Sequence, residues 1–359
     1  MDSQPKTILV TGGLGYIGSH TVNELYNLSY IQSLNIQNTY EVVIIDNCSN
    51  CSLKVLEILE KMTQHKIPFY NVDITDKAAM EEQVFKKHPS IYAVIHFAGK
   101  KSVAESQKDP LLYYTNNITG TLNLVELCLK YNVNNFIFSS SACVYGNRND
   151  SCTEEEKILS PINAYGRTKL YIENILIDVS RAHPQFKSVI LRYCNPVAAH
   201  KSGELGENPL GVPANLFPVI ENYVRGKIKK LKIFGNDYDT RDGTCIRDYV
   251  HVVDIAQGHI IALNCFNKEN EKFFKDSYVI YNMGTNEGYS VKEVFDTYME
   301  ANGITIDFEY GDRRPGDAAK ALPNCDKIAK ELGWKPTTTL KEMCRDSYNF
   351  VKRYPNGIE

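Results

Sequence analysis

A glycine-rich turn near the start of the chain limits the fold more than any other feature of the sequence. The β-branched run Lys6–Thr11 predicts a short strand, and residues 16–29 show the apolar periodicity of a helix. Three glycines join the two at three-residue intervals: Gly12, Gly15 and Gly18. Glycines at such a junction allow a tight turn, let the backbone approach a pyrophosphate, and let the helix pack closely on the strand. The free amides at the helix N-terminus complete a phosphate-binding site.

An acidic residue ends the next predicted strand, which spans residues 41–46. Asp46 stands at its carboxyl end, where a carboxylate can hold both ribose hydroxyls of NAD and would repel the additional phosphate of NADP. The glycine spacing differs from the commoner dinucleotide fingerprint, and an ordinary βα turn is the alternative interpretation. The order of strand, glycines, helix, second strand and aspartate favours an NAD-binding site.

Strand and helix signals alternate through the first half of the chain, which is typical of a parallel sheet covered by helices on both faces. We predict strands at residues 6–11, 41–46, 67–73, 91–98, 135–141 and 187–193. We predict helices at residues 16–29, 53–65, 76–88, 110–132 and 163–183. The predicted fold class is therefore α/β, a Rossmann-type, doubly wound parallel sheet with ligands at the carboxyl ends of its strands.

The pattern loosens in the second half of the chain, which predicts a smaller, less regular C-terminal α/β domain for the substrate. We expect residues 1–195 to form the NAD-binding Rossmann domain, which also receives part of 245–265. Residues 196–359 would form the substrate domain. Residues 30–40 are polar and rich in asparagine, so they predict a surface insertion. The charged segment 266–277 predicts a loop.

A tyrosine and a lysine lie four positions apart on the predicted helix 163–183. Tyrosine is a poor base because its phenol titrates near about 10. Lys169 lies one turn after Tyr165 on the same face, so its ammonium can favour the phenolate and permit proton exchange nearer neutral pH. Ser141, at the end of the predicted strand 135–141, can hydrogen-bond the same substrate hydroxyl. Next to a nicotinamide cofactor, these three groups suit the removal of a hydride from an alcohol carbon.

The same tyrosine–lysine spacing also occurs by chance in helices. Taken alone, it more often marks a packed tyrosine and a solvated lysine. The glycine turn and Asp46 supply the context that favours the catalytic interpretation here.

Composition and charge argue against several classes of protein. The 359 residues are 43% apolar and 23% charged, and the formal net charge is −3, which argues against nucleic-acid or anionic-membrane partners. We find no apolar run of the roughly 18 residues that a membrane span needs, and the first predicted strand begins too early to leave room for a secretory signal. We therefore expect a cytoplasmic protein whose ten cysteines are reduced thiols.

The pair Cys48-x2-Cys51 could indicate a metal or redox site. No second cysteine or histidine pair with ligand spacing stands near it in the sequence, and the eight histidines form no ligand cluster. We therefore predict no metal site.

Several long strings of the sequence carry a family resemblance. They span residues 10–21, 95–99, 138–142, 144–146, 234–238 and 247–254. Together they resemble the extended short-chain dehydrogenase/reductase family, and within it the UDP-galactose 4-epimerases, over nearly the whole chain. The resemblance implies reversible, NAD-dependent epimerisation at C4 of UDP-glucose and UDP-galactose through a 4-keto sugar. It also implies a nucleotide-sugar-binding second domain and a homodimer, whose candidate helices are 110–132 and 163–183.

The resemblance implies a role for each matching residue. Tyr165 would be the general acid/base, Lys169 its modulator, and Ser141 the contact of the sugar 4-hydroxyl. The cofactor-binding residues would be Gly12, Gly15, Tyr16, Ile17, Gly18, Asp46, Asn47, Asn50, Asp73, Ile74, Phe97, Ala98, Lys101, Asn116, Ser139, Tyr165, Lys169 and Tyr193. The substrate-binding residues would be Ser141, Tyr165, Asn195, Asn215, Leu216, Phe234, Arg247, Arg314, Asp317 and Ala321.

Chemical or steric arguments support the roles of three of these substrate-binding residues. Arg247 and Arg314 can hold a diphosphate bidentately, and surface salt bridges are their alternative interpretation. Ala321 stands four residues after Asp317, where the resemblance places a gate on the 2-position of the sugar. A tyrosine there disfavours N-acetylated sugars, whereas alanine leaves room for them, so UDP-GlcNAc and UDP-GalNAc are a predicted second substrate pair. The alternative is a displaced loop in which Ala321 gates nothing.

Two cysteines depart from the family pattern beside the predicted site. Cys143 stands where threonine is usual, and Cys194 where an aromatic residue is usual. A nucleotide-sugar 4,6-dehydratase is one alternative function, but that chemistry needs an Asp-Glu pair where this chain has Ala142 and Cys143. A non-catalytic NAD-binding protein of the same fold is another alternative. Relatives of that kind typically lose the tyrosine or the lysine, and this chain has both.

Overall fold

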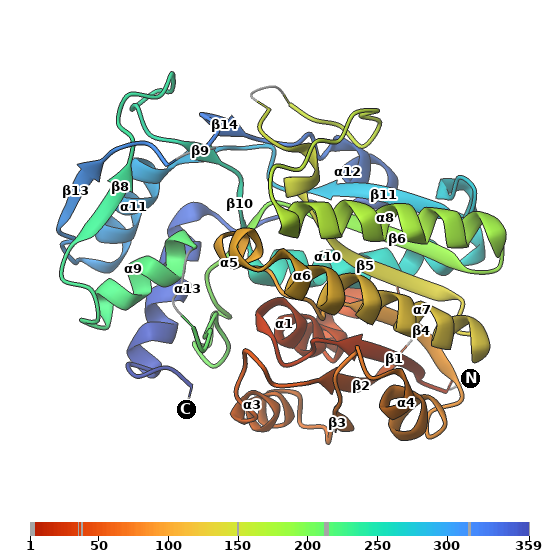
Figure 1. Ribbon diagram of the computed structural model, residues 1–359. Helices are drawn as coiled ribbons and strands as arrows, with labels where there is room; N and C mark the ends of the chain where they lie inside the picture. Colours follow the sequence, from red (N-terminus) through yellow and green to blue (C-terminus); the bar gives the residue numbers. More distant parts are fainter. Residues whose placement is uncertain are drawn as a thin grey trace.

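The computed structural model describes residues 4–34, 36, 39–148, 151–211, 215–314 and 317–358. A seven-stranded parallel sheet forms its centre, in the order β11-β6-β5-β4-β1-β2-β3 (Figure 1). The strands are β1 (Lys6–Thr11), β2 (Tyr40–Asp46), β3 (Phe69–Asn71), β4 (Ile91–His96), β5 (Asn135–Ser141), β6 (Lys187–Tyr193) and β11 (Tyr278–Met283). This sheet confirms the predicted Rossmann-type, doubly wound fold.

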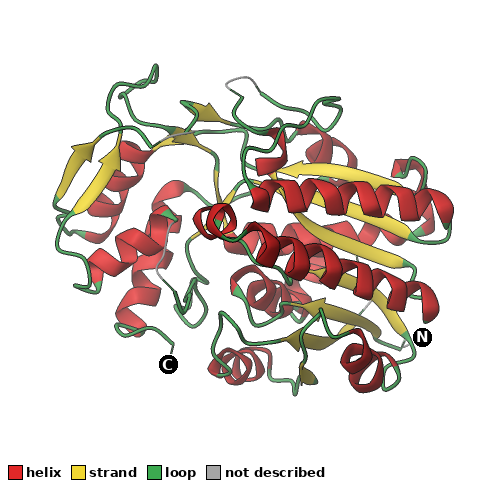
Figure 2. Cartoon of the chain, viewed as in Figure 1, coloured by secondary structure: helices red, strands yellow, loops and turns green. Residues whose placement is uncertain are grey.

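Both faces of the sheet are covered by helices, as Figure 2 shows. Successive side chains of a strand point to opposite faces, so Ile8 and Val10 of β1 enter one core and Leu9 enters the other. Helices α1 (Tyr16–Leu25), α3 (Lys54–Thr63) and α10 (Val252–Leu263) cover the first core; α4 (Lys77–Met80), α7 (Gly120–Lys130) and α8 (Ala164–Ala182) cover the second. The continuous apolar run of such strands therefore supplies side chains to both cores.

A smaller part with its own core is built from the second half of the chain. Phe217, Ile233, Tyr298 and Met343 are buried in that core. Its elements are α9 (Leu216–Val224), β8 (Leu231–Phe234), α11 (Val291–Asn302), β13 (Phe308–Gly311) and α13 (Leu340–Arg353), with β8 and β13 paired in parallel. In Figure 1 this part lies on the left, beyond the carboxyl ends of the central strands.

The remaining elements are short. They are α2 (Leu28–Ser33), π-helices η1 (Glu81–Phe85) and η2 (Tyr114–Thr119), α5 (Val103–Lys108), α6 (Pro110–Tyr113), 3-10 helices η3 (Ala142–Tyr145), η4 (Asn264–Phe266) and η5 (Lys268–Phe273), β7 (Asn195–Val197), β9 (Ile246–Arg247), β10 (Tyr249–His251), β12 (Tyr289–Ser290), β14 (Lys320–Ala321) and α12 (Asp326–Leu332). β7 pairs with β10, and β9 lies between β12 and β14. Among the described residues, no helix has the length and apolar character needed to span a membrane.

The seventh strand enters the sheet from the second half of the chain, and the sequence analysis did not assign this segment to the central sheet. β11 pairs with β6 at the edge of the sheet, and its run Tyr-Val-Ile-Tyr-Asn-Met gives only a short apolar signal after a charged segment. α10, within residues 245–265, packs against α1. The domain boundary after residue 195 stays a prediction.

Two predicted loops contain more structure than expected. Segment 266–277 includes the 3-10 turns of η5. Residues 30–40 include the end of α2, and the buried side chains of Ile31 and Ile36 anchor this insertion to the core. Residues 35, 37 and 38 lie outside the described residues.

Candidate active site

The turn between β1 and α1 has no room for a side chain at its closest points. Gly12 has a φ of +69°, and a Cβ there would lie 2.7 Å from the amide nitrogen of Ala98. A Cβ on Gly18 would lie 2.2 Å from the carbonyl oxygen of Gly12. The bare backbone therefore leaves a cradle at the carboxyl end of β1, beside the N-terminus of α1, and this geometry fits a pyrophosphate.

Asp46 ends β2 beside this cradle. Its Oδ2 accepts a hydrogen bond from the Leu14 amide at 3.1 Å, and its Oδ1 accepts one from the Cys48 amide at 2.9 Å. Burial raises the pKa of Asp46 above its usual value, although both amide hydrogen bonds oppose the shift. A carboxylate at this strand end fits the ribose side of a dinucleotide.

Further predicted cofactor residues are held at the same edge of the sheet. The Asn47 side chain donates to Asp73 at 2.7 Å, and Thr75 donates to the same carboxylate through its amide at 2.8 Å and its hydroxyl at 2.6 Å. Burial alone would raise the pKa of Asp73, but these hydrogen bonds outweigh it and the pKa is lowered. Asn50 accepts from the Leu210 amide at 3.1 Å. The β2 and β3 ends are thereby joined into one polar edge.

The first turn of α8 brings Tyr165 to the carboxyl end of β5. Asn163 caps the helix, because its side chain accepts from the Gly166 amide at 2.8 Å. Ser141 ends β5, and its side chain interacts with that of Tyr165. The strand end and the helix start therefore place these two hydroxyls against each other.

Lys169 lies one turn after Tyr165 and faces the same strand. Its Nζ donates to the Ser139 carbonyl at 2.7 Å and lies 5.9 Å from the centroid of the Tyr165 ring. The Ser139 hydroxyl in turn hydrogen-bonds the Tyr193 hydroxyl. The structure thus brings together the three predicted catalytic side chains and two predicted cofactor residues.

Burial governs the protonation of this pair in the protein alone. Burial, and after it nearby Cys143 and Tyr193, raises the pKa of Tyr165 above its usual value. Burial lowers the pKa of Lys169 to about 8, although Glu173 and Cys143 oppose the shift. The sequence analysis expected the ammonium to lower the pKa of the phenol, but desolvation outweighs that attraction here. Tyr165 is therefore held in its protonated form in the protein alone.

A buried ion pair lies beneath the site, between α8 and the strands of the sheet. The sequence did not predict it. Glu173 of α8 and Arg192 of β6 lie 2.6 Å apart, with 1% and 3% of their side chains exposed. The Ser140 hydroxyl of β5 also donates to Glu173. The pair joins the three elements that carry the site. The only feature of the sequence that could have indicated this ion pair is the position of Glu173, one helical turn after Lys169.

Lys101 is already paired in the protein alone. Its Nζ lies 2.5 Å from Glu207 and 5.8 Å from the centroid of the Tyr16 ring. The Glu207 side chain is only 6% exposed, so this pair joins the cofactor edge to the segment after β7. Glu207 was also missed from the sequence, because the two residues are 106 positions apart.

The remaining predicted cofactor residues flank the cradle. Phe97 follows β4, and its ring centroid lies 4.7 Å from that of His259, which is 5.8 Å from Tyr193. Asn116 is half-buried in η2, whereas its neighbour Asn117 is buried and donates to the Lys100 carbonyl at 3.1 Å. Asn117 thus fixes the segment that leads to Lys101.

Two arginines share one carboxylate on the side of the smaller part. The Nε of Arg314 donates to Asp317 at 2.9 Å, and the Nη2 of Arg247 lies 3.5 Å from the same carboxylate. The Arg314 guanidinium lies 5.1 Å from the centroid of the Phe234 ring. Ala321 of β14 pairs with Arg247 of β9, so it occupies a strand rather than a displaced loop. The structure brings these five predicted residues together.

A cavity of about 440 Å³ opens beside Asp317, and its lining also includes Tyr238, Arg313 and Ala319. Residues 315 and 316, between the two charged groups, lie outside the described residues.

The other predicted substrate residues stand apart from this cluster. Asn195 is exposed and donates to the Asp248 carbonyl at 3.0 Å. Asn215 is exposed at the start of α9, and Leu216 beside it is half-buried. Within the described ranges, no hydrogen bond joins these three residues to the two arginines.

The whole chain is similar to known proteins. The family model described as GDP-mannose 4,6 dehydratase matches residues 9–347. UDP-glucose 4-epimerase of Dictyostelium discoideum is 46% identical over 357 residues, which are 99% of each chain. The crystal structure of UDP-glucose 4-epimerase from Bifidobacterium longum in complex with NAD+ and UDP matches with a TM-score of 0.88 at 43% identity, over 98% of this chain and 100% of that one. The UDP-Glc/GlcNAc 4-epimerase of Campylobacter jejuni matches with a TM-score of 0.80 at 36% identity, over 97% and 99%.

Proposed function

We propose that this chain, which belongs to the UDP-glucose 4-epimerase family, interconverts UDP-glucose and UDP-galactose by reversible, NAD-dependent epimerisation at C4. The observation that carries the proposal is the placing of Ser141, Tyr165 and Lys169 at the carboxyl edge of the sheet. The glycine cradle that fits a dinucleotide lies at the same edge. Hydroxyl, phenol and ammonium so placed suit the oxidation and reduction of a sugar alcohol.

Conversion of UDP-galactose without any added oxidant or reductant tests this function. We expect the purified protein to form UDP-glucose, and to reach the same mixture when it starts from UDP-glucose. Failure to convert either sugar, or conversion only with an added reductant, would contradict the proposal.

When bound, NAD would supply the acceptor and the donor for the hydride exchanged with C4 of the sugar. The residues proposed to hold it are Gly12, Gly15, Tyr16, Ile17 and Gly18 at the pyrophosphate, Asp46, Asn47 and Asn50 at the adenosine ribose, Asp73 and Ile74 at the adenine, and Phe97, Ala98, Lys101, Asn116, Ser139 and Tyr193 around the rest.

The protein's own catalytic task is to move one proton. Ser141 orients the sugar 4-hydroxyl, and Tyr165 takes its proton and later returns it. Because burial raises the pKa of Tyr165, the phenolate needs positive charge nearby, and Lys169 supplies one such charge from the next helical turn. The hydrogen bond from Lys169 to the Ser139 carbonyl keeps that ammonium in place.

The arginine cluster is proposed to bind the UDP part of the substrate. In the protein alone, Asp317 is the acidic partner of Arg247 and Arg314. A diphosphate can replace it, because guanidinium groups bind phosphate oxygens bidentately. Asp317 is then released to accept from ribose hydroxyls. Asn195, Asn215, Leu216 and Phe234 are proposed to complete this site.

A dehydratase is the second candidate that a specific observation favours, since the matching family model carries that name. Dehydration needs an additional acid/base pair directly after the active-site hydroxyl residue. Ala142 and Cys143 occupy those positions after Ser141, and neither side chain is a carboxylate. We therefore propose the epimerase function and not the dehydratase function.

Asp46 is expected to make the protein prefer NAD over NADP. Its carboxylate would lie where the 2′-phosphate of NADP must bind, and like charges repel strongly where solvent is partly excluded. We expect affinities that differ by roughly 10- to 100-fold, and a smaller ratio in Asp46→Asn. Titration of both cofactors into nucleotide-free protein measures the ratio, with Glu41→Gln, an exposed change on the same strand, as control. Equal affinities in the wild type would show that Asp46 is misassigned.

Lys169→Met is expected to slow turnover and to raise the pH at which the rate reaches its maximum, because the phenolate loses its nearest ammonium.

The variant should remain as stable as the wild type at pH 7. The pKa of Lys169 falls to about 8 on folding, so the charged lysine costs stability below pH 8, and stability returns only as the pH rises toward the unfolded value. A pH–rate profile and a thermal midpoint check both points. An unmoved profile would refute the electrostatic role.

We also propose a homodimer and a cytoplasmic location. Exposed apolar side chains on neighbouring helices support the first: Leu111 of α6, Leu122 of α7 and Tyr171 of α8 are 74%, 39% and 43% exposed. All ten cysteines are free thiols, which supports a cytoplasmic location.

A further inference from the structure

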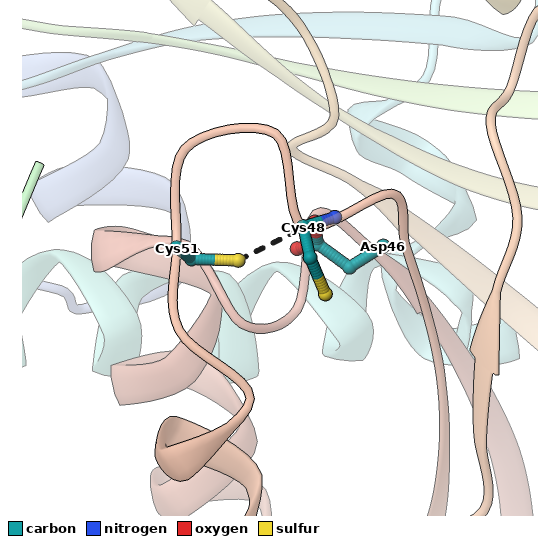
Figure 3. Close-up of side chains that lie close together, drawn as sticks. All are labelled: Asp46, Cys48 and Cys51. Atoms are coloured by element: carbon teal, nitrogen blue, oxygen red, sulfur yellow. Dashed lines mark hydrogen bonds between the residues drawn. The ribbon is translucent and has the colours of Figure 1, made fainter. Parts of the chain in front are cut away.

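The loop after β2 brings a carboxylate and two thiols together. Asp46 is the last residue of β2, and Cys48 and Cys51 follow it before α3 begins. The carboxylate oxygen and the two sulfur atoms all lie within 4.8 Å of one another. Figure 3 shows the Cys51 sulfur pointing toward the Asp46 carboxylate. The sequence spacing had offered only two ligands, and the fold adds the third.

The loop holds this arrangement by its own hydrogen bonds. Asp46 Oδ1 accepts from the Cys48 amide at 2.9 Å and from the Cys51 thiol at 3.6 Å. Asn47 Oδ1 accepts from the Ser49 amide at 3.1 Å. Cys48 has a φ of 53°, which turns the chain so that both thiols remain near the strand end. The donors are therefore positioned before any ion arrives.

One of the three ligand pairs already has the spacing that a tetrahedral metal ion requires. Zn²⁺ binds thiolate sulfur at about 2.3 Å and carboxylate oxygen at about 2.0–2.2 Å, which places two neighbouring ligands roughly 3.5 Å apart. Cys51 and Asp46 are already at that separation. Cys48 is half-buried, and Ser49 and Asn50 beside it are exposed, so an ion can reach the loop from solvent.

We propose that Asp46, Cys48 and Cys51 bind one thiophilic divalent cation of the Zn²⁺ type, with a water molecule in the fourth position. Two S–H bonds break and two metal–sulfur bonds form, so each ion bound releases two protons to solvent. Thiolate and carboxylate ligands together select such an ion over Mg²⁺ or Ca²⁺, which prefer oxygen ligands alone.

The consequence for function rests on the role proposed above for Asp46. The carboxylate that binds the metal is the one that would accept the ribose hydroxyls of NAD. A cation bound there draws the carboxylate toward the thiols and away from the ribose. Metal and NAD therefore compete, and the nucleotide-free protein is the form that takes up the metal.

Titration with Co²⁺ tests the site, because cobalt bound to thiolate gives a charge-transfer absorption that free cobalt lacks. We expect the nucleotide-free full chain to bind one equivalent with this absorption. Cys51→Ser should lose it, whereas Cys265→Ala, a buried thiol next to α10, should retain it. Retained NAD binding in Cys51→Ser shows that this variant is folded. An absorption missing from the wild type, or unchanged in Cys51→Ser, would overturn the site.

The competition has its own readout. We expect added NAD to remove the absorption, with an apparent cobalt affinity that falls in proportion to the NAD concentration. An absorption that persists at saturating NAD would overturn the competition. Equilibrium dialysis with NAD alone separates this result from the proposed function: a protein that binds Co²⁺ through Cys51 but binds no NAD keeps the metal site and loses the epimerase assignment.

Discussion

Tyr165→Phe is expected to lose about 10²- to 10⁴-fold in turnover, since a general acid/base group typically contributes this much. Phenylalanine keeps the ring and removes only the hydroxyl that interacts with Ser141, so folding and NAD binding should be preserved. Initial rates with UDP-galactose, measured beside an NAD titration, give the two quantities.

Tyr171→Phe is the matched control for this change. It removes a phenolic hydroxyl from the same helix at a side chain that is 43% exposed and lies two residues beyond Lys169. We expect it to retain wild-type turnover. If Tyr165→Phe turned over as fast as this control, Tyr165 would have no part in the proton transfer.

Ala321→Tyr is expected to abolish activity on an N-acetylated pair while sparing the glucose pair. The wild type should interconvert UDP-GlcNAc and UDP-GalNAc, because alanine leaves volume beside the sugar 2-position. Ala321 pairs with Arg247 in a short sheet, so its place relative to the proposed diphosphate site is fixed by backbone hydrogen bonds. A tyrosine there should reduce the N-acetyl rate by roughly 10²-fold or more, since a packed pocket does not relax such a clash cheaply.

The ratio of the two activities in one preparation is the measurement, because the glucose pair serves as its internal control. Inactivity of the wild type on the N-acetyl pair would refute the gate. Equal activity of the tyrosine variant on both pairs would refute it as well.

The features of the site that the sequence predicted are those carried by local pattern. Roles for Gly12 and Asp46 could be predicted because each residue stands at the end of a predicted strand. Parallel strands bring such ends to one edge of the sheet. The proximity of Tyr165 and Lys169 could be predicted because helical spacing alone places them on one face of the helix. Arg247 and Asp317 were predicted through the family resemblance, and the structure places their side chains 3.5 Å apart.

The features that the sequence could not predict depend on contacts between distant segments. Glu207 meets Lys101 only because the segment after β7 folds back over the cofactor edge. Arg192 meets Glu173 because β6 lies under α8. The raised pKa of Tyr165 follows from burial, which no spacing of residues reports. β11 was missed because six residues of mixed character carry too little periodicity to identify an edge strand.

The fate of the C4 hydrogen distinguishes hydride transfer from proton exchange during epimerisation. UDP-galactose that carries deuterium at C4 should yield UDP-glucose with the deuterium still at C4, because the same hydride leaves and returns within one closed site. The reaction is run in ordinary water. Mass spectrometry and proton NMR of the product then measure how much deuterium remains at C4. We expect nearly complete retention of the label. Loss of the label to solvent would show that C4 is inverted by proton exchange and would rule out the proposed hydride transfer.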